Sequence, residues 1–110
     1  MRNPPIRRGD VYLVDLSPTV GREILRARPC VVVSPDELNA NLATFVVAPM
    51  SSGSHAYPFR VSNRFRGRAG HVIVEQIRTV DRNRLLERMG RLSPIVLSQT
   101  LRVLQEMFSP

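Results

Sequence analysis

Residues 9–34 read GDVYLVDLSPTVGREILRARPCVVVS, two apolar segments joined by a basic connection. The segment from Gly9 to Leu16 alternates in part between two faces, as a half-buried strand does. The segment from Pro29 to Ser34 is a short β-branched run, typical of a strand buried on both faces. The connection between them is longer than that of most hairpins, and long connections often carry function. This stretch therefore predicts a mainly β protein with a candidate functional loop.

Further strand-like segments follow at intervals of roughly 8–12 residues. We expect strands at Thr44–Met50, Tyr57–Ser62 and Gly70–Glu75, and a sixth short strand around Gly90. Turn-forming pairs separate these segments, namely Ser17-Pro18, Ser34-Pro35, Ser52-Gly53 and Arg66-Gly67. Short strands at this spacing predict a small barrel or sandwich.

The last segment predicts an amphipathic helix. Ser93 suits the N-cap position, and Pro94 suits the first helical turn. An apolar stripe then recurs at helical spacing and is widened by neighbouring apolar residues. Its members are Leu97, Leu101, Leu104 and Phe108, with Val96, Val103 and Met107 beside them. Because such a stripe must be buried, we expect residues 1–110 to form one β-barrel domain closed by a C-terminal helix.

The composition favours a nucleic-acid partner. The chain has 16 basic residues against 9 acidic ones, a net charge of +7, and every basic residue is arginine. Guanidinium groups match phosphates bidentately, although codon usage explains the absence of lysine equally well. The single cysteine, Cys30, fits a reducing compartment. Since no secretory signal or run of about 18 apolar residues is present, we expect a cytoplasmic protein.

Common catalytic motifs are absent from the sequence. His55, His71 and Cys30 do not have the spacing of a metal site. There is no GxSxG, P-loop or GxGxxG motif. Phe45 and Phe59 are the only aromatics of the RNA-stacking kind at expected strand positions, which argues against an RRM sheet. These absences leave an enzyme without metal or cofactor, or a protein that is not an enzyme.

The basic connection is the first candidate for chemistry. Arg28 precedes Pro29, so its backbone is pushed into the extended region and its side chain can be aimed reproducibly. Without further information, the connection is simply a solvated basic loop. Its charged residues are Arg22, Glu23, Arg26 and Arg28.

Two other polar segments follow strands. Ser51 and Ser52 either donate hydrogen bonds to a phosphate or cap a turn. Glu75, Gln76 and Arg78 lie close together after an apolar strand. A carboxylate beside arginines is usually a surface ion pair, here of Glu75 with Arg78, and is occasionally a base.

Five segments, in this order, resemble the MazF/PemK family of toxins along essentially the whole chain. They are GDVYLVDLSPTVGRE, RP followed by VVVSPDELN, VAPMSSG, YPFRV and EQIRTVDRNRL. The resemblance implies a mainly β, SH3-like barrel of the CcdB/PemK type, usually a homodimer. It also implies a toxin that cuts single-stranded mRNA at short motifs without metal or cofactor, leaving a 2′,3′-cyclic phosphate and a 5′-hydroxyl. A cognate acidic antitoxin would be its protein partner.

The resemblance also implies roles for single residues. The family's arginine in the RP motif falls on Arg28, and its hydroxyl residue, commonly threonine, falls on Ser51. Its acidic residue before glutamine falls on Glu75, the implied base. An arginine that some members carry two positions earlier is here Ile73. We expect RNA contacts from Arg22, which replaces a histidine of some members, and from Glu23, Arg26, Ser52, Phe59, Gln76 and Arg78.

His71 is the alternative base. Positions separated by an even number share one face of a strand, so His71, Ile73 and Glu75 are expected to point the same way. Imidazole titrates near neutral pH, where base chemistry is needed. If His71 has no catalytic role, it is simply a packed residue of the strand. The residues alone do not decide whether His71 or Glu75 is the base, and the resemblance favours Glu75 narrowly.

Two other functions are open. A CcdB-like toxin directed at gyrase would share the barrel, but it would use C-terminal residues that include tryptophan, and this chain has none. A non-catalytic nucleic-acid-binding barrel would need only positive charge. A supercoiling assay tests the first alternative, and turnover with excess substrate tests the second.

Overall fold

The computed structural model describes residues 5–17 and 26–110, which contain seven strands and two α-helices. The strands are β1 (Asp10–Asp15), β2 (Ala27–Val32), β3 (Thr44–Ser52), β4 (Val61–Phe65), β5 (Arg68–Val72), β6 (Arg78–Asp81) and β7 (Leu85–Arg91). The helices are α1 (Asp36–Asn41) and α2 (Pro94–Met107), with two short 3-10 helices, η1 (Val74–Gln76) and η2 (Arg82–Arg84). No helix in these residues is long and apolar enough to cross a membrane.

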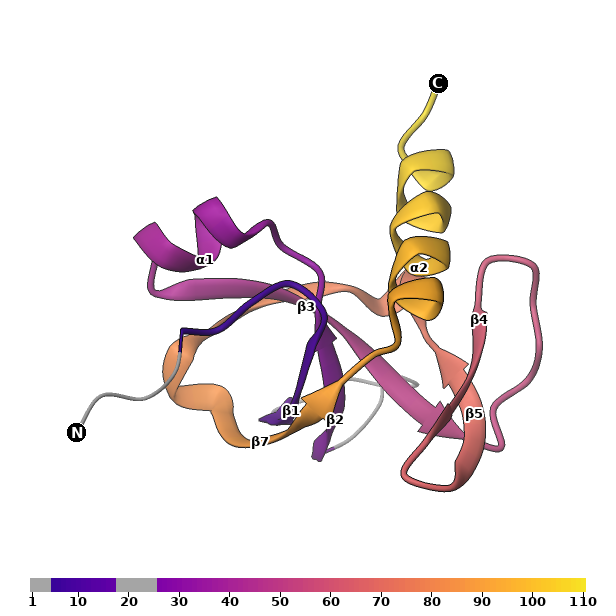
Figure 1. Cartoon of the computed structure of the whole chain (residues 1–110), viewed down its shortest axis with the longest axis horizontal. Helices are drawn as coiled ribbons and strands as arrows, with labels where there is room; N and C mark the ends of the chain where they lie inside the picture. Colours follow the sequence, from indigo (N-terminus) through magenta and orange to yellow (C-terminus); the bar gives the residue numbers. More distant parts are fainter. Residues whose placement is uncertain (1–4, 18–25) are drawn as a thin grey trace.

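The sheet curls around β3, its longest strand (Figure 1). The strand order is β4-β5-β3-β2-β1-β7, and β6 also pairs with β3. Successive parts of β3 pair with different antiparallel partners: residues 44–47 with β6, 47–49 with β2 and 50–52 with β5. Because adjacent strands are twisted relative to one another, a strand that changes partners along its length bends the sheet. The result is a mainly β half-barrel with a C-terminal helix, which confirms the predicted fold class.

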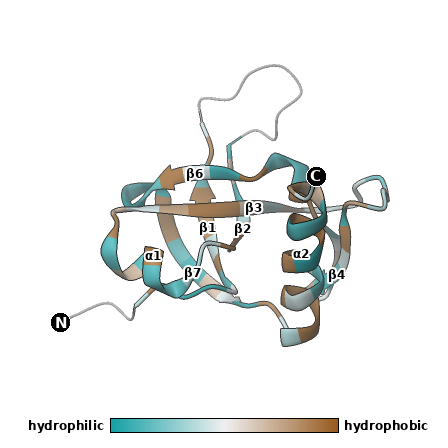
Figure 2. Ribbon diagram, turned by 90° about the horizontal axis from the view of Figure 1, so that it is seen from above, coloured by the Kyte–Doolittle hydropathy of each residue, from teal (hydrophilic) through white to brown (hydrophobic). Residues whose placement is uncertain are grey.

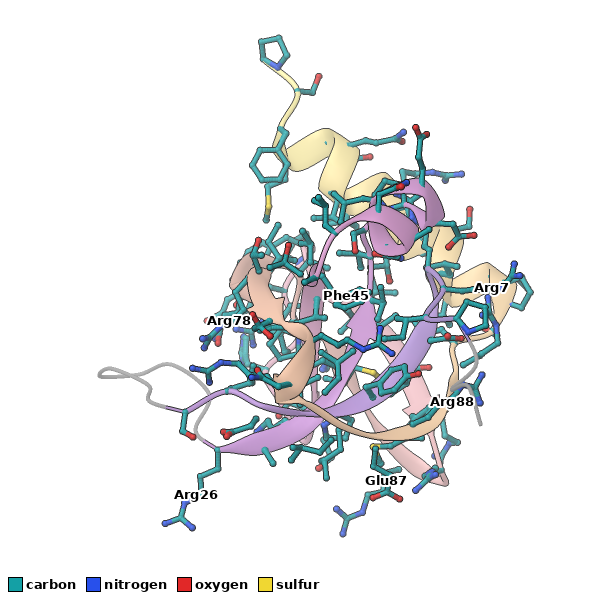
Figure 3. All side chains as sticks on the ribbon, turned by 90° about the vertical axis from the view of Figure 1, so that its left-hand side faces the viewer. Arg7, Arg26, Phe45, Arg78, Glu87 and Arg88 are labelled. Atoms are coloured by element: carbon teal, nitrogen blue, oxygen red, sulfur yellow. The ribbon has the colours of Figure 1, made fainter. Side chains whose placement is uncertain are left out.

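The strand predicted to be buried on both faces lies inside the half-barrel. In β2, the side chains of Cys30, Val31 and Val32 have no exposed surface. Phe45 of β3 is also fully buried and belongs to the same cluster as Cys30, and Figure 3 shows it in the middle of the molecule. Burial raises the pKa of the Cys30 thiol to about 12, because a thiolate is poorly solvated there.

Helix α2 begins as the sequence predicts. The Ser93 hydroxyl accepts a 3.3 Å hydrogen bond from the Val96 amide, and Pro94 occupies the first turn. The apolar residues of α2, brown in Figure 2, pack against a second core cluster, which includes Val31, Ala48 and Val72. The helix residues are Val96, Leu97, Leu101, Val103 and Leu104. Phe108, in contrast, is 72% exposed, because the helix ends at Met107 and the following residue leaves the stripe.

The strand predicted at Tyr57–Ser62 is wrong at its start. β4 begins at Val61, and the preceding residues form a turn closed by a 3.0 Å hydrogen bond from the Arg60 amide to the Tyr57 carbonyl. Pro58 has no amide hydrogen to offer a neighbouring strand, which favours the turn. β6 and α1 were not predicted from the sequence; the Ser34-Pro35 turn leads directly into α1.

The strand predicted at Gly70–Glu75 ends too late. β5 stops at Val72. The Ile73 amide still donates to the Pro49 carbonyl at 2.8 Å, but Pro49 has no amide hydrogen to return, and the Ile73 carbonyl instead accepts from the Gln76 amide at 3.1 Å as the chain turns into η1. The expected common face of His71, Ile73 and Glu75 is therefore wrong. Ile73 is buried at 2% exposure, whereas Glu75 lies at the surface.

Candidate active site

A pocket of about 130 Å³ lies where β2, β3 and the β4–β5 hairpin meet. It is lined by Arg28, Pro29, Met50, Ser51, Ser52, Asn63, Phe65, Arg68, Gly70 and His71. Two of these residues are arginines and none is acidic, so the pocket has a positive potential that suits an anion. Across residues 5–17 and 26–110, no group of three or more His, Cys, Asp or Glu side chains is arranged to hold a metal ion.

Arg28 lines this pocket and has a side-chain donor without a partner among the described residues. It lies near the start of β2, opposite Val14 of β1, and its side chain is half-buried. Its Nε atom is buried and has no hydrogen-bond partner among the described residues. A buried donor without an acceptor costs roughly 1–3 kcal/mol. An anionic oxygen bound to Nε would remove this cost and form a charge-assisted hydrogen bond.

Ser51 and His71 are neighbours across two paired strands. Ser51 of β3 lies directly opposite His71 of β5, and Ser52 lies opposite Gly70. A Cβ atom at position 70 would lie 2.0 Å from the Ser51 carbonyl oxygen, so only glycine permits this close approach. The approach of the two backbones thus brings a hydroxyl and an imidazole to the same wall of the pocket.

The Ser54 hydroxyl contacts the imidazole from the following loop. Its Oγ lies 2.8 Å from His71 Nδ1 and 3.3 Å from the Ser51 carbonyl oxygen. When the hydroxyl donates to that carbonyl, it accepts a hydrogen bond from Nδ1–H, and the imidazole lone pair then resides on Nε2. This tautomer is the one in which Nε2 can accept a proton.

Glu75 is not among the residues that line the pocket. It lies in η1 and forms an ion pair with Arg60, whose Nε is 3.1 Å from Oε2 and whose Nη2 is closer still. The ion pair expected with Arg78 is wrong, because the Arg78 guanidinium instead donates to the Leu16 carbonyl at 3.0 Å. The candidate bases are therefore separated: His71 lines the pocket with Arg28, and Glu75 holds another arginine.

The remaining predicted contact residues are dispersed. Ser52 lines the pocket, whereas Phe59 lies on the β3–β4 loop and Gln76 in η1. Arg26 is exposed at the entrance to β2 and points away from the ribbon in Figure 3. Arg22 and Glu23 lie outside the described residues.

The β4–β5 hairpin contributes residues to the pocket that were not predicted from the sequence. Asn63, Phe65 and Arg68 line the pocket, with Phe65 opposite Arg68 across the hairpin. The signal was the Arg66-Gly67 pair, where both residues have a positive φ, 51° and 78°. Two-residue turns of this kind fix the register of a hairpin. If the two expected strands on either side of this turn had been extended to it, they would have included these three residues.

Comparisons with a family model and with curated relatives indicate the same family. The family model described as PemK-like, MazF-like toxin of type II toxin–antitoxin system matches residues 7–108. Two curated relatives, both named endoribonuclease MazF, come from Staphylococcus epidermidis and Staphylococcus saprophyticus. They are 38% and 37% identical over 94 residues, covering 80% of this chain and 78% of each relative.

Solved structures share the fold. MazF from Deinococcus radiodurans superposes with a TM-score of 0.83 at 25% identity, over 96% of this chain and 97% of that one. A mycobacterial endoribonuclease, solved in complex with its cognate antitoxin, superposes with a TM-score of 0.76 at 23% identity, over 91% of each chain.

Proposed function

We propose that this chain, which belongs to the family of PemK-like, MazF-like toxins of type II toxin–antitoxin systems, cuts single-stranded mRNA at specific sequences, without a metal ion. The chain is an endoribonuclease of the MazF type and the toxin of a toxin–antitoxin pair. The finer proposal is carried by one observation: a single pocket contains a guanidinium, a hydroxyl and an imidazole, those of Arg28, Ser51 and His71.

The proposed reaction is an internal displacement at phosphorus. His71 Nε2 takes the proton of the ribose 2′-hydroxyl, the 2′-oxygen forms a bond to the adjacent phosphorus, and the bond from phosphorus to the 5′-oxygen breaks. The leaving 5′-oxygen takes a proton from water, and His71 later returns its proton to solvent. The products are a 2′,3′-cyclic phosphate and a 5′-hydroxyl.

Arg28 and Ser51 would stabilise the phosphate during this displacement. Negative charge accumulates on the phosphate oxygens, and a guanidinium fixed before the reaction stabilises that charge most effectively. Arg28 is assigned to charge stabilisation rather than proton donation, because guanidinium groups keep their protons in proteins. The Ser51 hydroxyl would donate a hydrogen bond to a phosphate oxygen.

We assign the base to His71 in preference to Glu75. His71 lines the same pocket as Arg28, and its contact with Ser54 is compatible with a free lone pair on Nε2. Glu75 forms an ion pair with Arg60, and the carboxylate would have to leave that ion pair before it could remove a proton from a sugar.

A chimeric substrate tests the internal nucleophile. An RNA with one 2′-deoxy nucleotide immediately upstream of a mapped cut should resist cleavage, because the attacking oxygen is gone. A matched RNA with the 2′-deoxy nucleotide one position downstream of the cut should be cut normally. Cleavage of both RNAs at the same rate would sink the proposal.

Chelation tests the metal-free mechanism. Guanidinium and imidazole groups supply the charge stabilisation and proton transfer that the displacement needs, so cleavage should persist in excess EDTA. Loss of cleavage on chelation, with recovery on addition of a divalent ion, would contradict this part of the proposal.

We also propose a cytoplasmic homodimer that binds an acidic antitoxin. The sheet path ends at β7, where Leu86 is 56% exposed, and α2 leaves Ile95 exposed. Monomers seldom leave strand edges and apolar residues of this kind uncovered. Light scattering should give a dimer mass at micromolar concentrations, and a monomer mass would overturn the assembly. The net charge of +7 should make antitoxin binding weaken as salt increases.

A further inference from the structure

The β4–β5 hairpin is only partly attached to the rest of the sheet. Its inner part pairs with β3, where residues 70–72 lie opposite residues 50–52. Among the strand pairings of the described residues, its outer part, residues 64–69, pairs only within the hairpin itself. A two-stranded hairpin is marginally stable in water by itself. The outer part therefore depends on side-chain contacts for its position.

Two side chains at the turn of the hairpin contact β7, the strand at the other end of the sheet path. Arg66 Nη2 donates to the Met89 carbonyl at 2.8 Å. The Phe65 ring lies against Gly90, where an added Cβ atom would be 3.7 Å from two carbons of the ring. The Arg66 guanidinium also lies 5.9 Å from the centroid of that ring. We call Phe65, Arg66, Met89 and Gly90 the β4–β7 seam.

Arg66 has a backbone conformation that other residues adopt more easily. Its φ is 51°, in the left-handed region, and the following Gly67 has a φ of 78°. Asparagine, aspartate and glycine are preferred at the first position of such two-residue turns. A strained residue persists only where the surrounding structure fixes it, and such residues gather at functional sites. What arginine provides here, and asparagine does not, is a side chain long enough to reach β7.

The outer part of the hairpin brings a second guanidinium to the pocket. Arg68 lies opposite Phe65 across the hairpin, and both residues line the pocket with Arg28. The Arg68 side chain has no hydrogen bond or ion pair with any other described residue, and no lining residue is acidic. Its donors are therefore available to an anionic oxygen. Because RNA carries one phosphate per nucleotide, a strand whose reacting phosphate contacts Arg28 has further phosphates close by.

We infer that Arg68 binds a second phosphate of the RNA backbone, beside the one that is cut, and that Arg66 is a positioning residue that keeps Arg68 at the pocket through the β4–β7 seam. This inference rests on the proposed function and adds a binding subsite to it. Ser51 and His71 lie opposite each other where the hairpin pairs with β3, so their positions do not depend on the seam. Loss of the seam should therefore weaken RNA binding and leave the chemical step intact.

Substitution of Arg66 provides the first test. Arg66→Asn introduces a residue that suits the turn but cannot reach β7, so a cooperative thermal transition should be retained. The substrate is an all-ribose oligonucleotide that spans a mapped cut. Arg66→Asn should raise KM by about fivefold, because Arg68 must then be ordered on binding, and should change kcat by less than about twofold. A wild-type KM, or a loss confined to kcat, would overturn the positioning role.

Substitution of Arg68 tests the phosphate contact itself. Arg68→Gln should raise KM by about tenfold, since a charge-assisted hydrogen bond is lost. Binding is then measured with the same oligonucleotide made uncleavable by a 2′-deoxy nucleotide at the cut. The slope of log affinity against log salt should become shallower by about 0.7, the value for one phosphate contact on a single strand. An unchanged slope would show that Arg68 does not bind a phosphate.

A double variant distinguishes positioning from direct contact. If Arg66 acts through Arg68, then Arg66→Asn should add little to a protein that already carries Arg68→Gln, because the group that it positions is gone. If KM instead rises again by the full effect of the single Arg66→Asn variant, then Arg66 contacts the RNA directly, and the positioning role is wrong.

Arg64 provides the matched control. It is an exposed arginine of the same hairpin, but its Nη1 donates to the Gly67 carbonyl at 2.8 Å, within the hairpin, and it does not line the pocket with Arg28. Arg64→Gln removes the same charge as Arg66→Asn and should leave KM within about twofold of the wild type. An equal rise in KM for both variants would show that only the net charge matters.

The wild-type protein separates this inference from the proposed function. If it does not cut the all-ribose oligonucleotide, the proposed function fails whatever the hairpin does. If it cuts normally and the Arg66 and Arg68 variants match it in KM and in salt dependence, only the second phosphate site and its positioning residue are wrong.

Discussion

Two regions of this molecule place an arginine near a candidate base, and the two arginines differ in what they pair with. In the pocket, Arg28 has a buried Nε without a partner among the described residues, and no acidic side chain is among the lining residues. In the loop between β3 and β4, Arg60 is bound by Glu75, by the face of the Tyr57 ring and by the His55 carbonyl. Both side chains are partly buried, but Arg28 lies in β2 and Arg60 in the loop that leads into β4.

The difference shows how to distinguish a substrate-binding arginine from a structural one. A guanidinium whose donors are satisfied within the fold gains little from an added phosphate, whereas an unsatisfied one gains a charge-assisted hydrogen bond. By this criterion Arg28 is a substrate-binding arginine, and Arg60 is a structural arginine that stabilises the β3–β4 loop. The criterion also divides the candidate bases, since His71 lies with the first arginine and Glu75 with the second.

Removing the unsatisfied arginine should have the largest effect. Arg28→Ala should lower the single-turnover cleavage rate by about 10²–10³-fold, the usual effect of losing one preorganised donor at a developing charge. The free energy of unfolding in urea should change little, because Nε makes no hydrogen bond within the described residues. A variant that keeps the wild-type rate would show that the pocket is not the reaction site.

Substituting the candidate base His71 should have the next largest effect, and Glu75 provides the comparison. His71→Gln should lower the maximal rate by about 10²-fold and abolish its fall toward acidic pH, since a protonated imidazole cannot accept the substrate proton. Arg28 and Arg68 are the other charged residues that line this pocket. Glu75→Gln should retain the acidic fall. The reverse pattern across a pH series would show that Glu75 is the base.

The hydroxyl of Ser51 should matter less than either charged group. Ser51→Ala should slow cleavage by roughly 1–2 kcal/mol in activation free energy, the value of one hydrogen bond to a charged oxygen. Ser51→Thr keeps the hydroxyl and should be at least as active as the wild type. Single-turnover rates test both variants, and an inactive threonine variant would contradict the role of the hydroxyl.

The smallest effect is expected at Ser54. Ser54→Ala removes the partner of His71 Nδ1, so both imidazole tautomers become accessible and the rate should fall by roughly 2- to 10-fold. Because the imidazole itself remains, the fall toward acidic pH should persist, unlike in His71→Gln. A Ser54→Ala profile that matches that of His71→Gln would mean that the whole wall of the pocket had been disturbed.

Local patterns in the sequence predicted the parts of the fold that depend on local chemistry. The β-branched run of β2 and the Ser93-Pro94 start of α2 could be read from neighbouring residues, since burial on both faces and helix capping have local signatures. The same-face argument for His71 and Glu75 failed because it assumed a continuing strand. The chain instead turns into η1 after residue 72, because Pro49 on the neighbouring strand has no amide hydrogen for the Ile73 carbonyl, which accepts from the Gln76 amide.

The candidate site was predictable only in part for the same reason. The resemblance identified Arg28 and Ser51, and the structure brings both to one pocket. The partner of Glu75 is 15 residues away in sequence, and Ser54 is 17 residues from His71. Pairings over such separations are set by the register of β5 with its two neighbours, β3 for the contact of Ser54 with His71 and β4 for the pair of Arg60 with Glu75.

The buried thiol of Cys30 has a practical consequence for spectroscopy. With its pKa raised to about 12, it holds roughly a thousandfold less thiolate at neutral pH than an ordinary cysteine, and it is shielded by β1 and β3. Alkylating dyes should therefore leave the native protein unmodified. A cysteine introduced at an exposed position such as Leu42 would be the single labelled site, so a fluorophore or spin label could be attached without first removing the native thiol from the core.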